Sequence, residues 1–379
     1  MELNTKDLVR ILQLKKMGRR TAKKLCDFSY QGLSSNLEDI IFEISSKKLI
    51  SRFPDYSRDE INKASNLGDQ ILEKSEVEKI TITSFYDEKF PRSLLTIEDP
   101  PILINTKGKL ENVLAMPAVA VIGTREPSSG GILAGEYFGK QLAKNKINVV
   151  SGLAKGCDAA GHRGCLSVNG ITTAILAHGL HTIYPKENRE LAEEIIDKGG
   201  VLLSEYFLGV GALANYFVER DRLQAGLSIG TIVIQTAEKG GTMHAVKATL
   251  SGRKVLAAIK YKDQELEYPK TAGNELLIRE GKAFGLTSDN FSVFLYNLSK
   301  AAAGVSQWQG TVNAFEDSLS LQQLGNESTQ SMTRSSEMSD PKGSCHTDEL
   351  PDRMQVRLSS DSNKQKMENI NAQTKMNLS

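Results

Sequence analysis

The sequence lacks an excess of charge of either sign. Its 379 residues include 47 lysines and arginines against 46 aspartates and glutamates, so no global field draws the protein toward nucleic acid and any anion site must be local. The four cysteines have no spacing typical of a disulfide framework, which suits a reducing compartment. No apolar run approaches the about eighteen residues of a membrane-spanning helix, and the N-terminus has no signal-peptide core. We therefore expect a soluble, cytoplasmic protein without a membrane partner.

Patterns for metal binding and hydrolysis are also missing. Cys157, His162 and Cys165 lie in one predicted helix, where positions 157 and 162 do not share a face, and no fourth ligand is evident. Three further histidines have no serine or cysteine nucleophile at a recognisable spacing (His178, His181 and His244). We expect no catalytic residue, no metal site and no cofactor.

Two glycine-rich turns are the strongest positive signal. The apolar run 119–122 ends at Gly123–Arg125, and the apolar run 147–150 ends at Ser151–Gly156; a helical segment follows each turn. Glycines let backbone N–H groups approach an anion, and each turn carries one cation, Arg125 or Lys155. The pair predicts a phosphate site, on a nucleotide or on a nucleic-acid backbone. The alternative is that both turns only bend the chain and leave their cations in solvent.

Alternating strands and helices predict the fold class. Six apolar runs read as strands: 119–122, 147–150, 171–176, 200–203, 231–234 and 254–259. Helical segments separate them, one entered through the turn Lys239–Thr242. Because parallel strands need helical crossovers, we predict an extended Rossmann-like α/β domain with a doubly wound, mostly parallel sheet. The two glycine-rich turns would then meet at the carboxyl edge of the sheet, where such sheets bind ligands.

The flanking regions differ in character. Residues 1–79 are predicted to form a small helical domain, in which Leu14–Leu25 resembles one helix-hairpin-helix element with a locally basic surface. Such a hairpin binds DNA phosphates in some proteins and packs or binds proteins in others. Residues 80–299 hold the Rossmann-like domain, and its first part, about 80–117, is rich in proline and predicted to add an edge strand. Residues 300–379 are polar, and we predict a disordered tail.

Successive motifs resemble one known family, the DNA-processing protein A family (DprA, also called Smf). They follow the order of that family over about residues 81–297: Val121–Ser128, Ser151–His162, Tyr184–Asn188, Leu202–Tyr206, Phe217–Ser228 and Gly273–Gly281. Asp221 stands where the family usually has asparagine, and Lys155 where it usually has arginine. A C-terminal winged-helix-like domain, carried by many members, is replaced here by the polar tail.

The resemblance implies a function in DNA handling. It suggests a protein that binds single-stranded DNA, protects incoming DNA and helps load the RecA recombinase in natural transformation, as a homodimer and without enzymatic activity. The stretch Arg220–Arg222 either adds phosphate contacts or braces the pocket by pairing with acids such as Glu205. Stacking on Tyr184, Tyr206 or Phe217 would hold bases. The predicted DNA-binding residues are Gly123, Thr124, Arg125, Ser151, Gly152, Lys155, Gly156, Arg220 and Arg222.

Two other functions remain open at this point. Phosphoribohydrolases of the "LOG" type share the fold superfamily, but their glycine-rich turn is followed by a catalytic glutamate, whereas Met243, His244 and Ala245 follow Gly240–Thr242 here. A nucleotide-binding sensor without chemistry is the related alternative. A nicotinamide-dependent dehydrogenase is disfavoured, because the first turn lacks G-x-G-x-x-G and no acid ends the second strand.

Overall fold

A nine-stranded sheet organises the described part of the chain. The computed structural model describes residues 3–28, 36–262 and 268–302. The strand order is β1-β2-β6-β5-β4-β3-β7-β8-β9, and only the pairs β1–β2 and β2–β6 are antiparallel. The strands are β1 (Thr81–Ser84), β2 (Leu103–Gly108), β3 (Ala118–Ile122), β4 (Asn148–Ser151), β5 (Thr172–Leu176), β6 (Val201–Ser204), β7 (Gly230–Val233), β8 (Val255–Ile259) and β9 (Phe284–Leu286).

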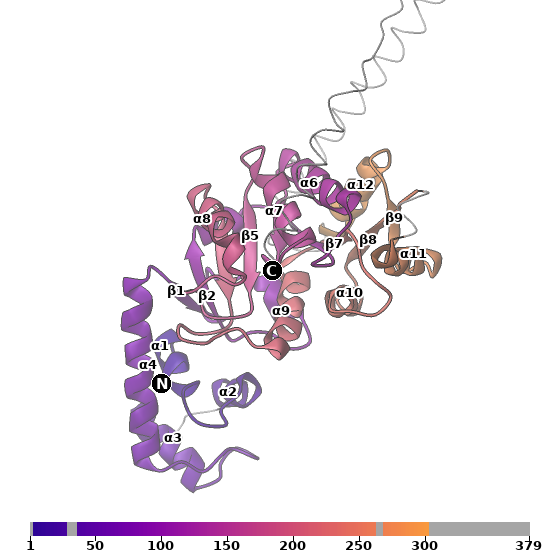
Figure 1. The fold of residues 1–379 in the computed structure, drawn as a ribbon. Coiled ribbons are helices and arrows are strands. Elements are labelled where there is room, and N and C mark those ends of the chain that lie inside the picture. Colours follow the sequence, from indigo (N-terminus) through magenta and orange to yellow (C-terminus); the bar gives the residue numbers. More distant parts are fainter. Residues whose placement is uncertain (1–2, 29–35, 263–267, 303–379) are drawn as a thin grey trace, which may run out of the picture. The chain divides into compact units, whose positions relative to one another are not determined.

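Helices cover both faces of this sheet, as a doubly wound fold requires (Figure 1). On one face, Val119 and Val121 of β3 pack in one core with Phe138 of α6 and Phe294 of α12. On the other face, the alternate residue Ile122 packs with helices α10 and α11. The helices around the sheet are α5 (Leu110–Leu114), α6 (Ser129–Lys144), α7 (Cys157–Leu166), α8 (Arg189–Asp197), α9 (Ala214–Leu227), α10 (Thr242–Ser251), α11 (Ala272–Arg279) and α12 (Phe291–Ala302). The predicted Rossmann-like fold is confirmed.

The six predicted strands are all present, as β3–β8. The proline-rich segment forms two antiparallel strands, β1 and β2, rather than the single edge strand predicted from sequence. Prolines 91, 100 and 101 all lie in the connection between these two strands, not within a strand. This connection also includes a short 3-10 helix at Arg92–Thr96. Strand β9 was not predicted, because three residues around Gly285 are too few to give a periodic signal.

The N-terminal residues form four helices with a core of their own. These are α1 (Thr5–Ile11), α2 (Arg19–Cys26), α3 (Leu37–Ser46) and α4 (Arg58–Val77). Side chains of Asn4, Asn36 and Ser57 cap three of them at the N-terminus. Ile102, which precedes β2, and Leu103, its first residue, join this core, so these helices pack against the antiparallel edge of the sheet.

The helix α12 ends at Ala302, past the predicted domain boundary at residue 299. The rest of the predicted tail, residues 303–379, lies outside the described residues, and its predicted disorder stays a prediction. None of the helices in the described ranges is both long and apolar enough to cross a membrane.

Helices α6 and α7 approach each other through glycines. A Cβ on Gly139 of α6 would lie 2.2 Å from the carbonyl oxygen of Gly161, and a Cβ on Gly164 of α7 would lie 2.0 Å from that of Glu136. Both obstacles are backbone atoms, which cannot move without shifting a helix. The close approach fixes α6 and α7 against each other, and both helices begin at the carboxyl edge of the sheet.

We therefore expect Gly139→Ala to destabilise the protein by about 2–3 kcal/mol through overpacking, although alanine favours an isolated helix. Urea unfolding measures the change. Gly211→Ala is the matched control, because no atom lies within 4 Å of its added Cβ, and it should change the free energy of unfolding by less than about 0.5 kcal/mol. Equal effects of the two substitutions would contradict the packing argument.

Candidate functional site

A pocket of about 730 Å³ opens at the carboxyl ends of β3 and β7. On one side of β3 the next strands are β4, β5 and β6, in that order. On its other side they are β7, β8 and β9. The pocket therefore lies at the point where the strand order reverses, the usual ligand position in an open α/β sheet. Turns that follow β3 and β7, together with helix α9, provide most of its lining.

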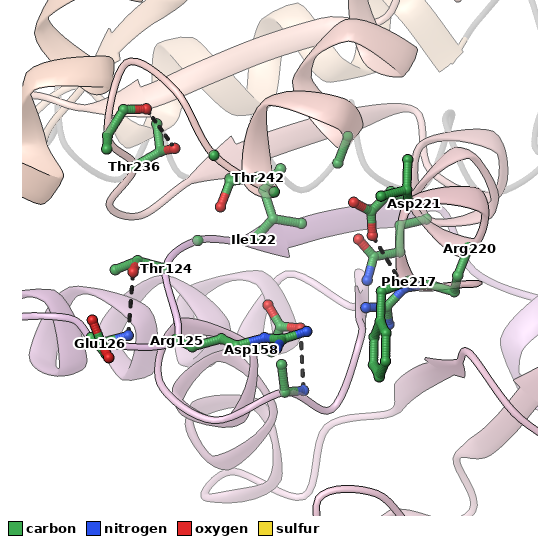
Figure 2. Close-up of a pocket in the computed structure, with 18 of the residues that line it drawn as sticks. Ile122, Thr124, Arg125, Glu126, Asp158, Phe217, Arg220, Asp221, Thr236 and Thr242 are labelled. Carbon is green, nitrogen blue, oxygen red and sulfur yellow. Dashed lines mark hydrogen bonds and ion pairs between the residues drawn. The ribbon is translucent and has the colours of Figure 1, made fainter. Parts of the chain in front are cut away.

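The turn after β3 brings Arg125 into this pocket. Thr124 N–H donates to the carbonyl oxygen of Gln235 at 2.7 Å, and the Gln235 amide exchanges hydrogen bonds with Ser128, the N-cap residue of α6. These bonds tie the turn to the end of β7. Arg125 is exposed, and its guanidinium carbon lies 5.0 Å from the centre of the Phe217 ring of α9 (Figure 2). Gly123, Thr124 and Arg125 line the pocket, and their contact with DNA stays a prediction.

The turn after β4 lies against the first turn, as expected. The Cys157 N–H donates to the carbonyl oxygen of Thr124 at 3.2 Å, and a Cβ on Gly156, whose φ is +78°, would lie 2.6 Å from that oxygen. However, this turn binds its own helix: the Asp158 carboxylate accepts from the N–H groups of Gly152 and Ala154. These two amides are therefore already satisfied within the chain.

The other predicted residues of this second turn do not line the pocket. Lys155 is half-exposed and pairs with Glu187 at 2.5 Å. Ser151 is buried, and its hydroxyl donates to the carbonyl oxygen of Val121. The second turn thus shapes the first one, and a direct DNA contact of Ser151, Gly152, Lys155 or Gly156 stays a prediction.

Helix α9 carries the two predicted arginines in different surroundings. Arg220 is buried, donates to the carbonyl oxygen of Ile175 and pairs with Asp221 at 3.2 Å. Arg222 lies outside the pocket lining, and its Nη2 atom donates to Glu205 Oε2 at 2.5 Å. These contacts are those of bracing residues, the second of the two roles that the sequence left open. A phosphate contact of either arginine stays a prediction.

Sequence reasoning missed a third turn as part of the site. Lys239, Gly240, Gly241 and Thr242 line the pocket at the N-terminus of α10, with Lys270 nearby. An added Cβ on Gly240 or Gly241 would have no atom within 4 Å, so both glycines border open space. The signal was visible, since a lysine, two glycines and a threonine precede a helix. What the sequence did not show is that β7 lies next to β3.

Two of the three predicted stacking residues belong to the pocket. Tyr184 is half-exposed, with its ring centre 5.8 Å from that of Phe217. Tyr206 instead stacks on Tyr216 and donates its hydroxyl hydrogen to Glu219, outside the pocket lining. Arg125, Phe217 and Tyr184 thus place a cation beside two aromatic rings.

Asp221 gives the pocket a titratable carboxylate. Burial raises its pKa to about 6, although the neighbouring charge of Arg220 opposes the change. Figure 2 shows Asp221 and Phe217 projecting from α9 beside the pocket. The site therefore combines exposed cations with an acid that loses its charge in mildly acidic solution.

Comparison with known proteins agrees with this architecture. The family model of DNA recombination-mediator protein A matches residues 81–294, a range that includes the whole pocket. The chain belongs to this family. The resemblance to DprA seen in the sequence motifs is thereby confirmed.

Protein Smf of Escherichia coli is 35% identical over 195 residues, which are 51% of this chain and 51% of that protein. The chain thus spans about half the length of this curated relative. The X-ray structure of DprA from Streptococcus pneumoniae is 28% identical with a TM-score of 0.64, covering 77% of this chain and 98% of that one. A structure of DprA from Helicobacter pylori, described for its single-stranded DNA binding mode, is 27% identical with a TM-score of 0.50, covering 56% and 93%.

Proposed function

We propose that the chain binds single-stranded DNA without sequence specificity in the pocket at the carboxyl ends of β3 and β7. The observation that carries this proposal is Arg125, whose guanidinium lies over Phe217 at the pocket mouth. An aromatic face accepts any base, and a cation beside it accepts the adjoining phosphate. The similarity to the H. pylori structure, which is described for its single-stranded DNA binding mode, supports the same ligand.

The pocket lining contains two kinds of group, cations and aromatic rings. Arg125, Lys239 and Lys270 supply positive charge toward the backbone of the strand, and the N-terminus of α10 adds partial positive charge. Tyr184 and Phe217 supply ring surface for bases. Because the whole chain carries almost no net charge, DNA binding depends on this local arrangement of cations. The affinity for DNA should therefore fall as the salt concentration rises.

Family membership also supports a proposal for the wider role. We propose a DNA-processing protein of natural transformation that works without catalysis, protects incoming single strands and hands them to the RecA recombinase, as a homodimer. The family match and the similarity to DprA proteins support this role. A nucleotide sensor is the competing function, since a cavity of about 730 Å³ also accommodates a mononucleotide.

Arg125→Ala should weaken binding of a labelled single-stranded oligonucleotide about tenfold, because it removes one charge-assisted phosphate contact. The slope of log K against log salt should also become shallower by about 0.7, the value for one phosphate on a single strand. Fluorescence anisotropy at several salt concentrations measures both quantities.

Arg279→Ala is the matched control, because Arg279 is exposed at the end of α11 and does not line the pocket. It should leave the affinity and the slope unchanged. If the wild type binds no oligonucleotide even at low salt, the proposed function fails. Binding of a mononucleotide under the same conditions would favour the sensor.

Acidification should strengthen DNA binding between pH 7.5 and pH 5.5. Above its pKa of about 6, Asp221 is ionised and repels phosphate, and below that pH the neutral acid does not. We expect an affinity gain of about three- to tenfold from removing this charge. Asp221→Asn should bind more tightly at pH 7.5 and lose this part of the pH dependence, and an unchanged profile in that variant would contradict the assignment to Asp221.

A further inference from the structure

A cluster of ionised side chains joins the N-terminal helices to the back of helix α9. It contains Arg19 and Arg20 of α2, Arg222 of α9, and three acids, Asp99, Glu205 and Glu219. None of these six residues lines the pocket. The cluster is therefore a second charged site, separate from the proposed DNA contacts.

Arg19 occupies the centre of this cluster. Its Nε atom donates to Asp99 Oδ2 at 2.8 Å, and its Nη1 atom lies 3.7 Å from Glu205 and 3.5 Å from Glu219. The Arg19 side chain is 27% exposed, so solvent screens these pairs only partly. Burial alone would raise the pKa of Asp99, but the hydrogen bond and charge of Arg19 hold it below its usual value. Arg19 is thus committed to contacts within the chain.

The acids that pair with Arg19 either belong to α9 or pair with Arg222 of α9. Glu219 belongs to α9, and Glu205 holds Arg222 of the same helix. Burial raises the pKa of Glu205, and the positive charges of Arg222 and Arg19 oppose this change. Without Arg19, the three acids would face Arg222 and the exposed Arg20 alone, and the pairing that holds α9 would change.

The residues of α9 that line the pocket and those that belong to the cluster lie on opposite sides of the helix. Phe217, Arg220 and Asp221 stand at positions i, i+3 and i+4 and line the pocket, whereas Glu219 and Arg222 stand at i and i+3 of another stripe. The N-cap residue of α9 is Leu213, whose side chain makes no capping hydrogen bond. The helix is therefore positioned by its packing, by the buried bond from Arg220 to Ile175, by Lys254 at its C-terminal end, and by this charged stripe.

We propose that Arg19 is a positioning residue of the pocket, through which the N-terminal helices hold α9 and so set the affinity for single-stranded DNA. The proposal rests on the proposed function for its DNA readout. It also gives the basic surface around Gly18 a use other than DNA contact. In this arrangement Arg19 acts on Phe217 and Asp221 through the helix that carries them.

The test compares Arg19→Gln with Arg20→Gln, neighbours of the same chemistry. Arg20 is 81% exposed and, among the residues that the structure describes, forms an ion pair only with Asp99, at 3.6 Å. Arg19→Gln should weaken oligonucleotide binding about tenfold with an unchanged salt slope, since no phosphate contact is lost. Arg20→Gln should change the affinity less than about twofold, because exposed pairs contribute little. Arg19→Lys, which keeps the charge but not the forked geometry, should fall between wild type and Arg19→Gln.

Hydrogen exchange gives a readout that does not need DNA. In Arg19→Gln, amides of residues 214–227 should exchange faster while those of β3 and β4 keep their protection, which separates local release of α9 from unfolding. A salt slope shallower by about 0.7 in Arg19→Gln would overturn the proposal in favour of direct phosphate contact. Unchanged exchange in α9 would overturn it as well. If the wild type binds no DNA, the proposed function fails, and exchange in α9 still decides whether Arg19 positions the helix.

Discussion

The pocket depends on the contacts of one buried group, the guanidinium of Arg220. It donates to the carbonyl oxygen of Ile175 in β5, pairs with Asp221, and lies so close beneath Gly152 that a Cβ there would be 1.9 Å from its Nη1 atom. Asp158 of α7 faces it and holds the turn after β4. One cation thus joins a strand, a turn and two helices, and a buried charge of this kind must keep its partners to be tolerated.

This constraint explains why the second glycine-rich turn is built inward. Its amides serve Asp158, and Gly156 packs on the Thr124 carbonyl, so the turn supports the first one. The first turn is then free to present Arg125 beside Phe217. Two turns that look equivalent in sequence differ in the structure, because the first places Gly123, Thr124 and Arg125 in the pocket lining, whereas the second contributes only Ala154 to it.

Positive and negative charges almost cancel over the chain, so the arrangement of cations matters locally. Arg125, Lys239 and Lys270 line the pocket, and Lys270 also pairs with Glu126 at 3.7 Å. Arg220 lines it as well but is buried, and Arg19 and Arg222 pair with acids behind α9. A near-neutral chain can in this way gather cations at one pocket without a basic surface over the whole molecule. Asp221 adds an acid to the same pocket, which links the site to pH.

The sequence by itself determined the six central strands, the helical N-terminal region, the family and the position of Arg125. These follow from local patterns: apolar runs of strand length, glycines at their ends, and motifs in a fixed order. Tertiary structure alone decided which residues of those motifs line the pocket. Lys155 and Arg222 meet Glu187 and Glu205, which are distant in the chain, and Lys239 joins the site because β7 pairs with β3. Strand order and ion pairing are long-range properties, and neither leaves a periodic trace in the sequence.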